Sequence, residues 1–448
     1  MKILVLSHVS DYVGGAERSI LQVLDVWKKE HDIELEFILR KPLGSYVKEL
    51  DKRNIKYYAV DYTYWSDSNP PRDVYRKYNT ARRNSRAVLQ IEKIIQESQP
   101  DIVATNSIVA PWAAFAAHYQ QVPHVWFVRE YGDLDHGREF EIGREKTFQD
   151  IGNLSNIVIA NSQTLASHVK QFVDPNKVTA LYTPFDIGEL HKQSKIKVKN
   201  PFTTKESLRL VMTGNLAPSK GHLDAIKAVG EVNAKGYSVE LGIIGRLGQD
   251  DFMKTLHAAI DEYDIKDKVH FLGYQSNPLS IVAKADAGIM ASRQEAFGRV
   301  TFEYIAMGKP VIGSKSGATP EIIDDAVCGY LYMPGDTKDL AGKIEAYAKD
   351  RGLIDSHSKA ALKKAEKMMT SEYSAAITYE KVVASLNLPL LTPLNFTHRW
   401  LEYPEMAAKY MDMSNKYSLR TLLRLRLRAQ VKPYYVFVRD TYARITGR

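Results

Sequence analysis

The chain has 448 residues, of which 44% are hydrophobic and 25% are charged. This length and composition predict a soluble globular protein of two or three domains. No apolar run in the sequence is long enough to span a bilayer. Its single cysteine, Cys328, excludes a disulfide framework and a cysteine-rich zinc site and favours a reducing, cytoplasmic compartment. The net charge of +8 lies in residues 416–448, which hold nine of the 61 Lys and Arg residues and one of the 53 acids, so the neutral remainder argues against a nucleic-acid-binding protein.

Short apolar runs alternate with helical patterns through residues 1–185. The first run, KILVLSH, predicts a strand, and apolar residues at helical spacing over 15–29 predict a helix after it. A long polar helix is expected from about 72 to 97. Further strands are predicted at IELEFILR, KYYAVDY, PDIVATNS, HVWFVRE, NIVIANS and VTALYTP. Because such alternation builds a parallel sheet covered by helices on both faces, this part is expected to be a doubly wound, Rossmann-like domain.

The alternation stops at residues 186–206, which are polar and rich in Lys and are predicted to be a linker. It resumes over 207–370, where strands are predicted at LRLVMTGNL, VELGIIGR, KVHFLGY, AGIMASR, KPVIGSK and GYLYMP. Since ligands bind at the carboxyl ends of the strands in such sheets, the two domains are expected to face each other across a cleft and to share one site. Residues 371–395 are predicted to form a helix that crosses back to the first domain, and residues 396–448 a basic helical tail.

The segment 295–323, EAFGRVTFEYIAMGKPVIGSKSGATPEII, combines two carboxylates with a strand-to-helix turn. Glu295 follows a predicted strand, and Glu303 lies in the first turns of a helix that is predicted to begin at Gly298 or Arg299. A helix N-terminus offers unpaired N–H groups and partial positive charge to a phosphate. Ionised carboxylates accept hydrogen bonds from sugar hydroxyls. The combination predicts a nucleotide sugar as ligand, although a glutamate at a helix start also stabilises the helix by itself.

The same segment resembles the signature of the retaining glycosyltransferases of family 4, a "group 1" type with the GT-B fold. The signature has two glutamates eight positions apart, Phe-Gly early in the spacer and A-x-G-x-P-V-I after it, and the resemblance covers about residues 1–385. It implies that Glu303 binds the ribose of the nucleotide and that Glu295 contacts the transferred sugar. The residues that it implies beside the sugar and diphosphate of the donor are Phe297, Gly298, Arg299 and Val300.

The segment 213–226, TGNLAPSKGHLDAI, is a second candidate for donor binding. Lys220 lies at a predicted helix start, where a compact ammonium group can neutralise a diphosphate, although a solvated surface lysine is the alternative. Asn215 stands where the family usually has Arg, so an uncharged amide occupies that donor-binding position. Arg246 or Arg299 is expected to supply the missing positive charge.

A glycine pair follows the first predicted strand, in the segment SDYVGGAERSI. Gly14 and Gly15 allow the backbone to approach a phosphate or sugar closely, and in the family a glycine-rich loop at this place faces the donor. Glu17 begins the next helix, where a charge that caps the helix explains it as well as a functional role does.

The strand HVWFVRE ends in Arg129 and Glu130, where the family often has a histidine. These two residues, with Asn106 at the end of the preceding strand, are predicted to lie on the acceptor side of the site. Pairing of Arg129 and Glu130 with their neighbours is an equal alternative.

Retention through a double displacement would need a carboxylate nucleophile about 5 Å from a second carboxyl group. The resemblance instead implies a front-side attack in which the leaving diphosphate takes the proton of the acceptor, so the protein positions the reactants and stabilises charge. The expected catalytic residues are Glu295, Lys220 and Arg299. No D-x-D motif is present, so no metal ion or cofactor is expected besides the nucleotide-diphosphate sugar as co-substrate.

Residues 416–448 interleave Arg with Leu, Tyr, Phe and Val. A basic amphipathic helix of this kind is typical of binding to an anionic membrane surface, although packing on the protein or on a partner is the alternative. Together with the resemblance, this predicts a cytoplasmic enzyme, peripheral at the inner face of the membrane, that acts on a glycan or lipid-linked acceptor in bacterial cell-surface polysaccharide assembly. The alternatives are an inactive sugar-nucleotide-binding subunit and a GT-B nucleotide-sugar epimerase.

Overall fold

The computed structural model describes residues 1–12, 14–68, 74–204, 206–387 and 394–396. Met1–Thr392 form one compact unit that contains all the helices and strands discussed below. The predicted membrane-binding segment 416–448 lies outside the described residues. No helix within the described ranges combines the length and the apolar character needed to cross a bilayer.

The first sheet has seven strands, all paired in parallel, in the order β3-β2-β1-β5-β6-β8-β9. The strands are β1 (Lys2–Ser7), β2 (Glu34–Arg40), β3 (Lys56–Val60), β5 (Ile102–Asn106), β6 (His124–Val128), β8 (Ile157–Ala160) and β9 (Val178–Ala180). Every residue of β5, β6 and β8 is buried, as expected where helices cover both faces of a parallel sheet. The helices are α1 (Gly15–Glu30), α2 (Tyr46–Asp51), α3 (Val74–Ser98), α4 (Trp112–Tyr119), α5 (Asp133–His136), α6 (Arg144–Asn153) and α7 (Gln163–Val169).

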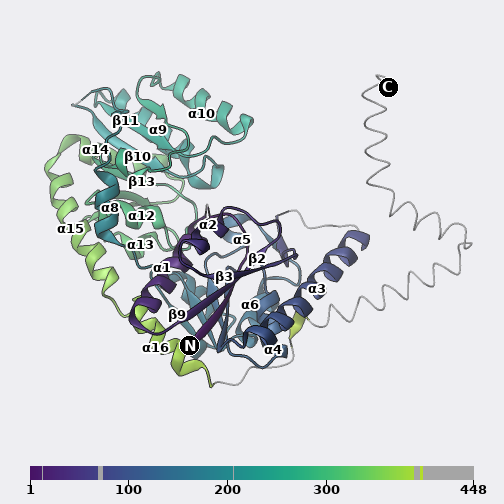
Figure 1. Ribbon diagram of the computed structural model, residues 1–448. Helices are drawn as coiled ribbons and strands as arrows, with labels where there is room; N and C mark the ends of the chain where they lie inside the picture. The colour runs from purple at the N-terminus through teal and green to yellow at the C-terminus, as the bar shows by residue number, and fades with distance from the viewer. Residues whose placement is uncertain (13, 69–73, 205, 388–393, 397–448) are drawn as a thin grey trace, which may run out of the picture. The chain divides into compact units, whose positions relative to one another are not determined.

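The second sheet has six parallel strands in the order β12-β11-β10-β13-β14-β15. The strands are β10 (Leu208–Thr213), β11 (Val239–Ile244), β12 (Val269–Phe271), β13 (Ala287–Met290), β14 (Val311–Ser314) and β15 (Gly329–Tyr332). The helices are α9 (His222–Ala234), α10 (Asp250–Glu262), α11 (Leu279–Val282), α12 (Arg299–Ala306), α13 (Thr319–Ile322), α14 (Thr337–Lys349) and α15 (Gly352–Met369). The predicted α/β class with two Rossmann-like sheets is confirmed (Figure 1).

Both strand orders reverse direction once. In the first sheet the chain builds outward from β1 to β3 and then returns to the other side of β1 with β5. In the second sheet β10 and β13 flank the corresponding point. Ligands of open α/β sheets bind outside the carboxyl ends of the strands at such a reversal. The loops after β1, β5, β10 and β13 are therefore the places where the topology alone puts a site.

Two segments join the halves of the unit. Residues 186–206, predicted as a linker, contain helix α8 (Ile187–Ser194), whose N-terminus is capped by Asp186, which accepts a hydrogen bond of 2.9 Å from the Glu189 N–H. After α15, helix α16 (Ala375–Ser385) packs against α1, as Figure 1 shows, and the Trp27 indole N–H donates to the Ala375 carbonyl over 2.7 Å. Val382 is buried in the core of the first half, so the chain after the second sheet completes that core.

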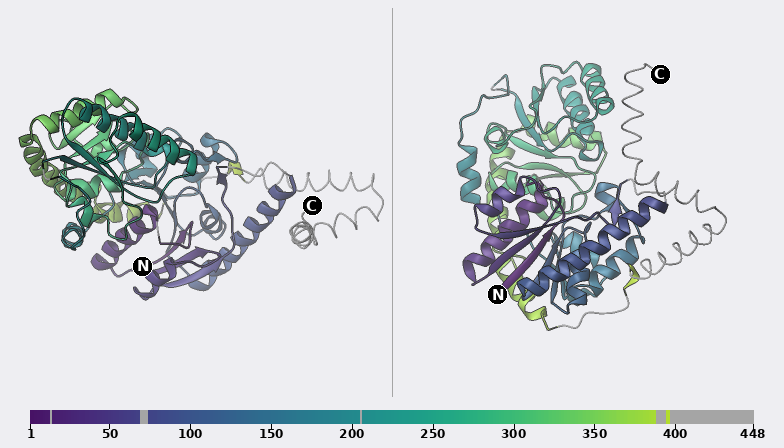
Figure 2. Two further views of the ribbon diagram at one scale, coloured as in Figure 1. Left: turned by 90° about the horizontal axis from the view of Figure 1, so that it is seen from above. Right: turned by 45° about the vertical axis from the view of Figure 1, so that its right-hand side comes forward.

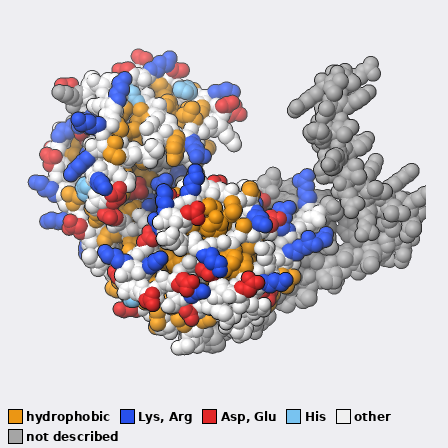
Figure 3. Space-filling model, in the orientation of Figure 1, with side chains coloured by type: hydrophobic (Ala, Val, Ile, Leu, Met, Phe, Trp, Pro, Cys, Tyr) orange, Lys and Arg blue, Asp and Glu red, His pale blue; other side chains and the backbone are white. Residues whose placement is uncertain are grey.

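The long polar helix predicted near 72–97 is α3, which has 25 residues and is the extended blue helix in Figure 2. A short antiparallel pair, β4 (Ser66–Asp67) with β7 (Glu139–Phe140), is a further feature of the first half that the sequence did not predict. On the face shown in Figure 3, acidic and basic side chains are interspersed over the described surface. This agrees with the near-neutral charge of the chain outside its tail.

Candidate active site

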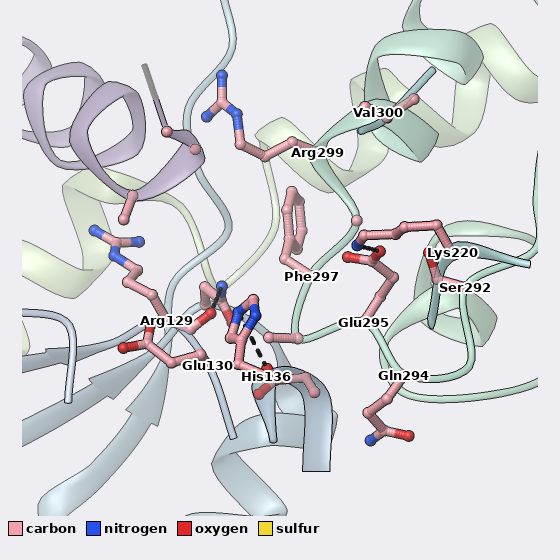
Figure 4. Close-up of a pocket in the computed structure, with 18 of the residues that line it drawn as sticks. Arg129, Glu130, His136, Lys220, Ser292, Gln294, Glu295, Phe297, Arg299 and Val300 are labelled. Carbon is pink, nitrogen blue, oxygen red and sulfur yellow. Dashed lines mark hydrogen bonds and ion pairs between the residues drawn. The ribbon is translucent and has the colours of Figure 1, made fainter. Parts of the chain in front are cut away.

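A cavity of about 600 Å³ lies where loops at the carboxyl ends of both sheets meet. Ten of the predicted site residues line it: Gly14, Gly15, Arg129, Glu130, Lys220, Glu295, Phe297, Gly298, Arg299 and Val300. Figure 4 shows Lys220 and Glu295 on one side of the cavity and Arg129, Glu130 and His136 on the other. The predicted residues that do not line it are Asn106, Asn215, Arg246 and Glu303.

Lys220 and Glu295 form an ion pair on the wall contributed by the second half. The Lys220 Nζ lies 2.5 Å from Glu295 Oε1. Lys220 ends a short 3-10 turn, and Gly221 follows at φ 71°, where a Cβ would lie 2.2 Å from the Ala291 carbonyl oxygen. Only glycine fits this left-handed conformation and this close approach. The turn is therefore held against the end of β13, and this contact fixes the position of the ammonium group.

A second glycine fixes the backbone of Glu295. Gly317 adopts φ 51°, and a Cβ there would lie 2.2 Å from the Glu295 carbonyl oxygen. The N–H of Ala318 donates to the same oxygen over 2.9 Å. The loop after β14 thus supports the loop after β13, which explains why glycine and small residues follow the strand in SKSGAT.

Helix α12 presents its N-terminus at the cavity. Gly298 is the N-cap residue at φ 88°, and the first hydrogen bond of the helix runs from the Phe302 N–H to the Gly298 carbonyl over 3.1 Å. The N–H groups that precede Phe302 in the helix have no intrahelical partner, because no carbonyl lies one turn before them. With Lys220 beside them, these groups form a surface suited to a diphosphate.

Arg299 reaches from α12 to the other half of the unit. Its guanidinium donates to Ser19 Oγ over 2.8 Å and to Gln22 Oε1 over 2.9 Å, both on α1. Its Cζ lies 4.6 Å from the centre of the Phe185 ring. One face of the cavity is therefore closed by a contact between residues about 280 positions apart in the sequence.

Glu303, predicted to bind the ribose, lies behind Arg299. Its Oε1 is 3.8 Å from Arg299 Nη2, and burial raises the pKa of its carboxyl group while the guanidinium opposes that rise. Asn215 and Arg246 are exposed at the ends of β10 and β11, and the Arg246 N–H donates to Asn215 Oδ1 over 3.4 Å. Of the two arginines expected to supply positive charge, Arg299 is the one that lines the cavity.

Arg129 and Glu130 are held by different partners at the end of β6. The Arg129 Nε donates to Asn106 Oδ1 over 3.1 Å, and burial lowers the pKa of the guanidinium to about 10. Glu130 accepts hydrogen bonds from the Ser107 hydroxyl and, over 2.9 Å, from the Ile108 N–H. Burial raises the pKa of its carboxyl group. Both residues are thus bound to neighbours and also line the cavity, and Asn106 acts by orienting Arg129.

The structure adds titratable residues that the sequence analysis did not identify as part of the site. His8, at the end of β1, His136 and Arg138 line the cavity. The His8 Nδ1 lies 3.5 Å from Oε1 of Glu17, a residue for which the sequence left both a helix-capping charge and a functional role open. Burial lowers the pKa of His8 to about 4 and raises that of Glu17 to about 7. The position of His8 at the topological reversal of the first sheet was the sequence signal that could have identified it.

No three His, Cys, Asp or Glu side chains are grouped as ligands for a metal ion in the described part of the chain. The chemistry available at the cavity comes from the Lys220–Glu295 pair, the start of α12 and Arg299 on one side and from a mixed acidic and basic wall on the other. Cations and free N–H groups can stabilise negative charge that develops on a leaving group, and carboxylates can accept hydrogen bonds from sugar hydroxyls.

Comparison with known families matches each half of the chain. Residues 13–189 match the family described as Glycosyltransferase Family 4, and residues 192–368 match that described as Glycosyl transferases group 1. Over 205 residues the chain is 31% identical to N-acetyl-alpha-D-glucosaminyl L-malate synthase of Bacillus anthracis, covering 44% of this chain and 52% of that protein. Over 375 residues it is 23% identical to Poly(glycerol-phosphate) alpha-glucosyltransferase of Bacillus subtilis (strain 168), covering 82% of this chain and 49% of that protein. The matched region thus spans about half the length of these relatives.

Solved structures share the fold. Anabaena Alr3699/HepE in complex with UDP and glucose matches with a TM-score of 0.64 and 22% identity, over 86% of this chain and 99% of that chain. The apo form of the lipopolysaccharide outer core galactosyltransferase WaaB matches with a TM-score of 0.64 and 20% identity, over 86% of this chain and 99% of that chain. At this level of identity the likeness establishes the two-sheet GT-B architecture.

Proposed function

The chain belongs to glycosyltransferase family 4, and from this premise we propose that it transfers a sugar from a nucleotide-diphosphate sugar to an acceptor hydroxyl with retention of anomeric configuration. The observation that carries the proposal is the Lys220–Glu295 pair at the wall of the cavity, beside the N-terminus of α12. Positive charge and a fixed carboxylate then stand side by side, as the diphosphate and the sugar hydroxyls of such a donor require.

In this proposal the chain's own groups position the donor and stabilise its leaving group. Lys220, Arg299 and the first N–H groups of α12 face the diphosphate, and their charge offsets the negative charge that develops as the glycosidic bond breaks. Glu295 accepts hydrogen bonds from the transferred sugar. The diphosphate oxygen takes the proton of the acceptor hydroxyl on the same face of the sugar. The step is proposed to need no metal ion, so transfer should persist in EDTA.

We further propose that the acceptor is a glycan or a lipid-linked molecule of bacterial cell-surface polysaccharide assembly. Similar proteins carry names that specify capsular polysaccharide in Staphylococcus aureus and the lipopolysaccharide core in Rhizobium meliloti (strain 1021). The basic segment 416–448 is proposed to hold the enzyme at an anionic membrane surface. The test is binding of the full chain to phosphatidylglycerol vesicles, which should be strong at low salt and weaken as salt is added. A chain that does not bind the vesicles at low salt would contradict the proposal.

The second candidate is an inactive sugar-nucleotide-binding subunit, which is favoured by Asn215 at a position where the family usually has Arg. A nucleotide-sugar epimerase of the same fold would instead convert one donor into another without an acceptor. One screen separates the three functions: binding and slow hydrolysis of UDP-, GDP-, dTDP- and ADP-sugars by the wild type and by Glu295→Gln.

Transferase activity predicts that one donor binds, that its nucleoside diphosphate is released slowly in water, and that Glu295→Gln suppresses the release. Glu189→Gln, on the outer face of α8, is the matched control and should release the product at the wild-type rate. Donor binding with no release, even in the presence of acceptor extracts, would support the inactive subunit. Conversion of the donor sugar into its epimer would support the epimerase, and binding of no donor would overturn all three.

A further inference from the structure

The first half carries two arginines, Arg138, which lines the cavity, and Arg40, which does not, and neither forms an ion pair with a described carboxylate. Arg40 and Arg138 both approach the ring of Tyr64, with Cζ atoms 4.8 Å and 5.5 Å from its centre. Arg40 donates to the Tyr62 carbonyl over 2.9 Å and to the Tyr64 hydroxyl over 3.1 Å, and Arg138 donates to the Ser66 carbonyl over 3.0 Å. Neutral oxygens therefore orient both guanidinium groups while their charge remains available to a ligand.

Two histidines lie near these arginines. The Tyr64 hydroxyl donates to the His8 carbonyl over 3.0 Å, and the two rings lie 6.5 Å apart. His136 lines the cavity together with His8 and Arg138. Burial is the largest cause that lowers the pKa of the His8 imidazole, and the positive charges of Arg138, Arg40 and His136 lower it further. The side chains around Tyr64 thus form a site in which further positive charge is unfavourable and negative charge is favourable.

The described acids near this wall form no ion pair with Arg138. Asp135 lies 4.0 Å from His136 Nε2 and accepts hydrogen bonds of 2.8 Å from the N–H groups of Tyr131 and Gly132, so it is held in that turn and its charge acts on His136 rather than on Arg138. Asp133 is paired with Arg144 at 2.6 Å. The remaining carboxyl groups at this wall, Glu17 and Glu130, have pKa values raised by burial, and neither forms an ion pair with Arg40 or Arg138.

A half-buried guanidinium without a counter-ion costs free energy that an anionic ligand removes. Its planar fork binds carboxylate or phosphate through two parallel hydrogen bonds. The diphosphate of the donor already has its own cations on the opposite wall, Lys220 and Arg299. The positive groups around Tyr64 are therefore separate from the cations that are proposed to face the diphosphate.

We infer that the acceptor carries a carboxylate or phosphate group and that this group binds to Arg138 and His136, with Arg40 reinforcing the charge from behind Tyr64. This inference rests on the proposed function, because it identifies the second substrate of the same cavity. The anionic group fixes one end of the acceptor at the wall of the first half, which presents a neighbouring hydroxyl to the donor sugar held by the second half. Arg138 is then a residue that determines acceptor specificity.

The test uses the full chain, with the donor found in the screen above, and three small probes: sn-glycerol 3-phosphate, L-malate and uncharged glycerol. Probe binding is followed by saturation-transfer NMR, and donor binding by calorimetry. The variants are Arg138→Gln, Arg138→Lys, which keeps the charge, and Arg53→Gln, an arginine of the first half that does not line the cavity and that pairs with Asp25 and Glu49. Thermal melting of each variant verifies that it is folded.

We expect at least one anionic probe to bind the wild type and glycerol not to bind. Arg138→Gln should weaken that binding tenfold or more, Arg138→Lys should restore part of it, and Arg53→Gln should leave it unchanged. Donor affinity should be equal in all four proteins. Binding of glycerol 3-phosphate alone would assign a phosphate, and binding of malate alone a carboxylate.

Three results would overturn the inference while leaving the proposed function intact: donor binding with neither anionic probe bound, anionic binding unaffected by Arg138→Gln, or a loss of donor affinity in Arg138→Gln, which would assign the arginine to the donor. Failure of the wild type to bind any donor would instead overturn the proposed function itself.

Discussion

Replacement of Gly221 by alanine should displace the turn that carries Lys220. The residue adopts φ 71°, and the added methyl group would lie 2.2 Å from the Ala291 carbonyl oxygen and 2.7 Å from the Ala291 Cβ. The left-handed conformation costs a residue with a Cβ about 1–2 kcal/mol. Relief of the overlap against backbone costs about 1–3 kcal/mol more, as in other overpacked sites. The free energy of unfolding should therefore fall by about 2–5 kcal/mol.

Gly236→Ala isolates the first of these two contributions. Gly236 adopts φ 88°, but a Cβ there would meet no atom within 4 Å, so only the conformational cost of about 1–2 kcal/mol applies. Guanidinium denaturation should be followed by circular dichroism, because no tryptophan lies between residues 207 and 370. A shift of the turn by about 1 Å should also slow sugar transfer by about 100-fold in Gly221→Ala, while Gly236→Ala keeps the wild-type rate. Equal stability losses in the two variants, or full activity of Gly221→Ala, would refute the reasoning.

Three further changes test other contacts. Lys220→Gln should slow release of the nucleoside diphosphate in single-turnover kinetics by about 10²–10³-fold through loss of charge stabilisation, and an unchanged rate would exclude Lys220 from that role. Glu321→Gln should destabilise the fold by about 1–2 kcal/mol and speed hydrogen exchange in α7. The reason is that the Glu321 carboxylate accepts hydrogen bonds from the N–H groups of Gln163 at 3.0 Å and Thr164 at 2.5 Å, at the start of that helix. Amides of α7 that stay as protected as in the wild type would contradict this. Burial raises the pKa of Glu17 to about 7, so the folded state binds the proton more tightly than the unfolded state. This contribution to stability is complete below the ordinary pKa near 4.5 and is lost as the pH rises through 7. The free energy of unfolding of the wild type, measured relative to that of Glu17→Gln, should therefore fall by up to ~3 kcal/mol over that pH range. A difference between the two proteins that does not change with pH would show that Glu17 is not buried in this way.

The local order of strands and helices follows from the sequence, because each element carries its own apolar period. Strand patterns such as KILVLSH and VELGIIGR correspond to β1 and β11, and the strand–turn–helix around 295–303 corresponds to the end of β13, the loop and α12. The abundance of Lys in the segment 186–206 predicted a polar linker and obscured the apolar contacts of this segment. Ile187 and Phe202 pack against the core of the second half, so this connection is ordered and contains α8.

The sequence by itself determined that two parallel sheets form and that glycines and a lysine–glutamate set lie at strand ends, because those features depend on residues close together in the chain. Only the tertiary structure decided that Arg299 bonds to α1, that Glu303 lies behind it, and that His136 and Arg138 join the opposite wall. These placements depend on contacts between residues that are far apart in sequence, and such contacts leave no periodic signal in either segment. The cavity is therefore a property of how the loops of two sheets meet, which no single stretch of the chain encodes.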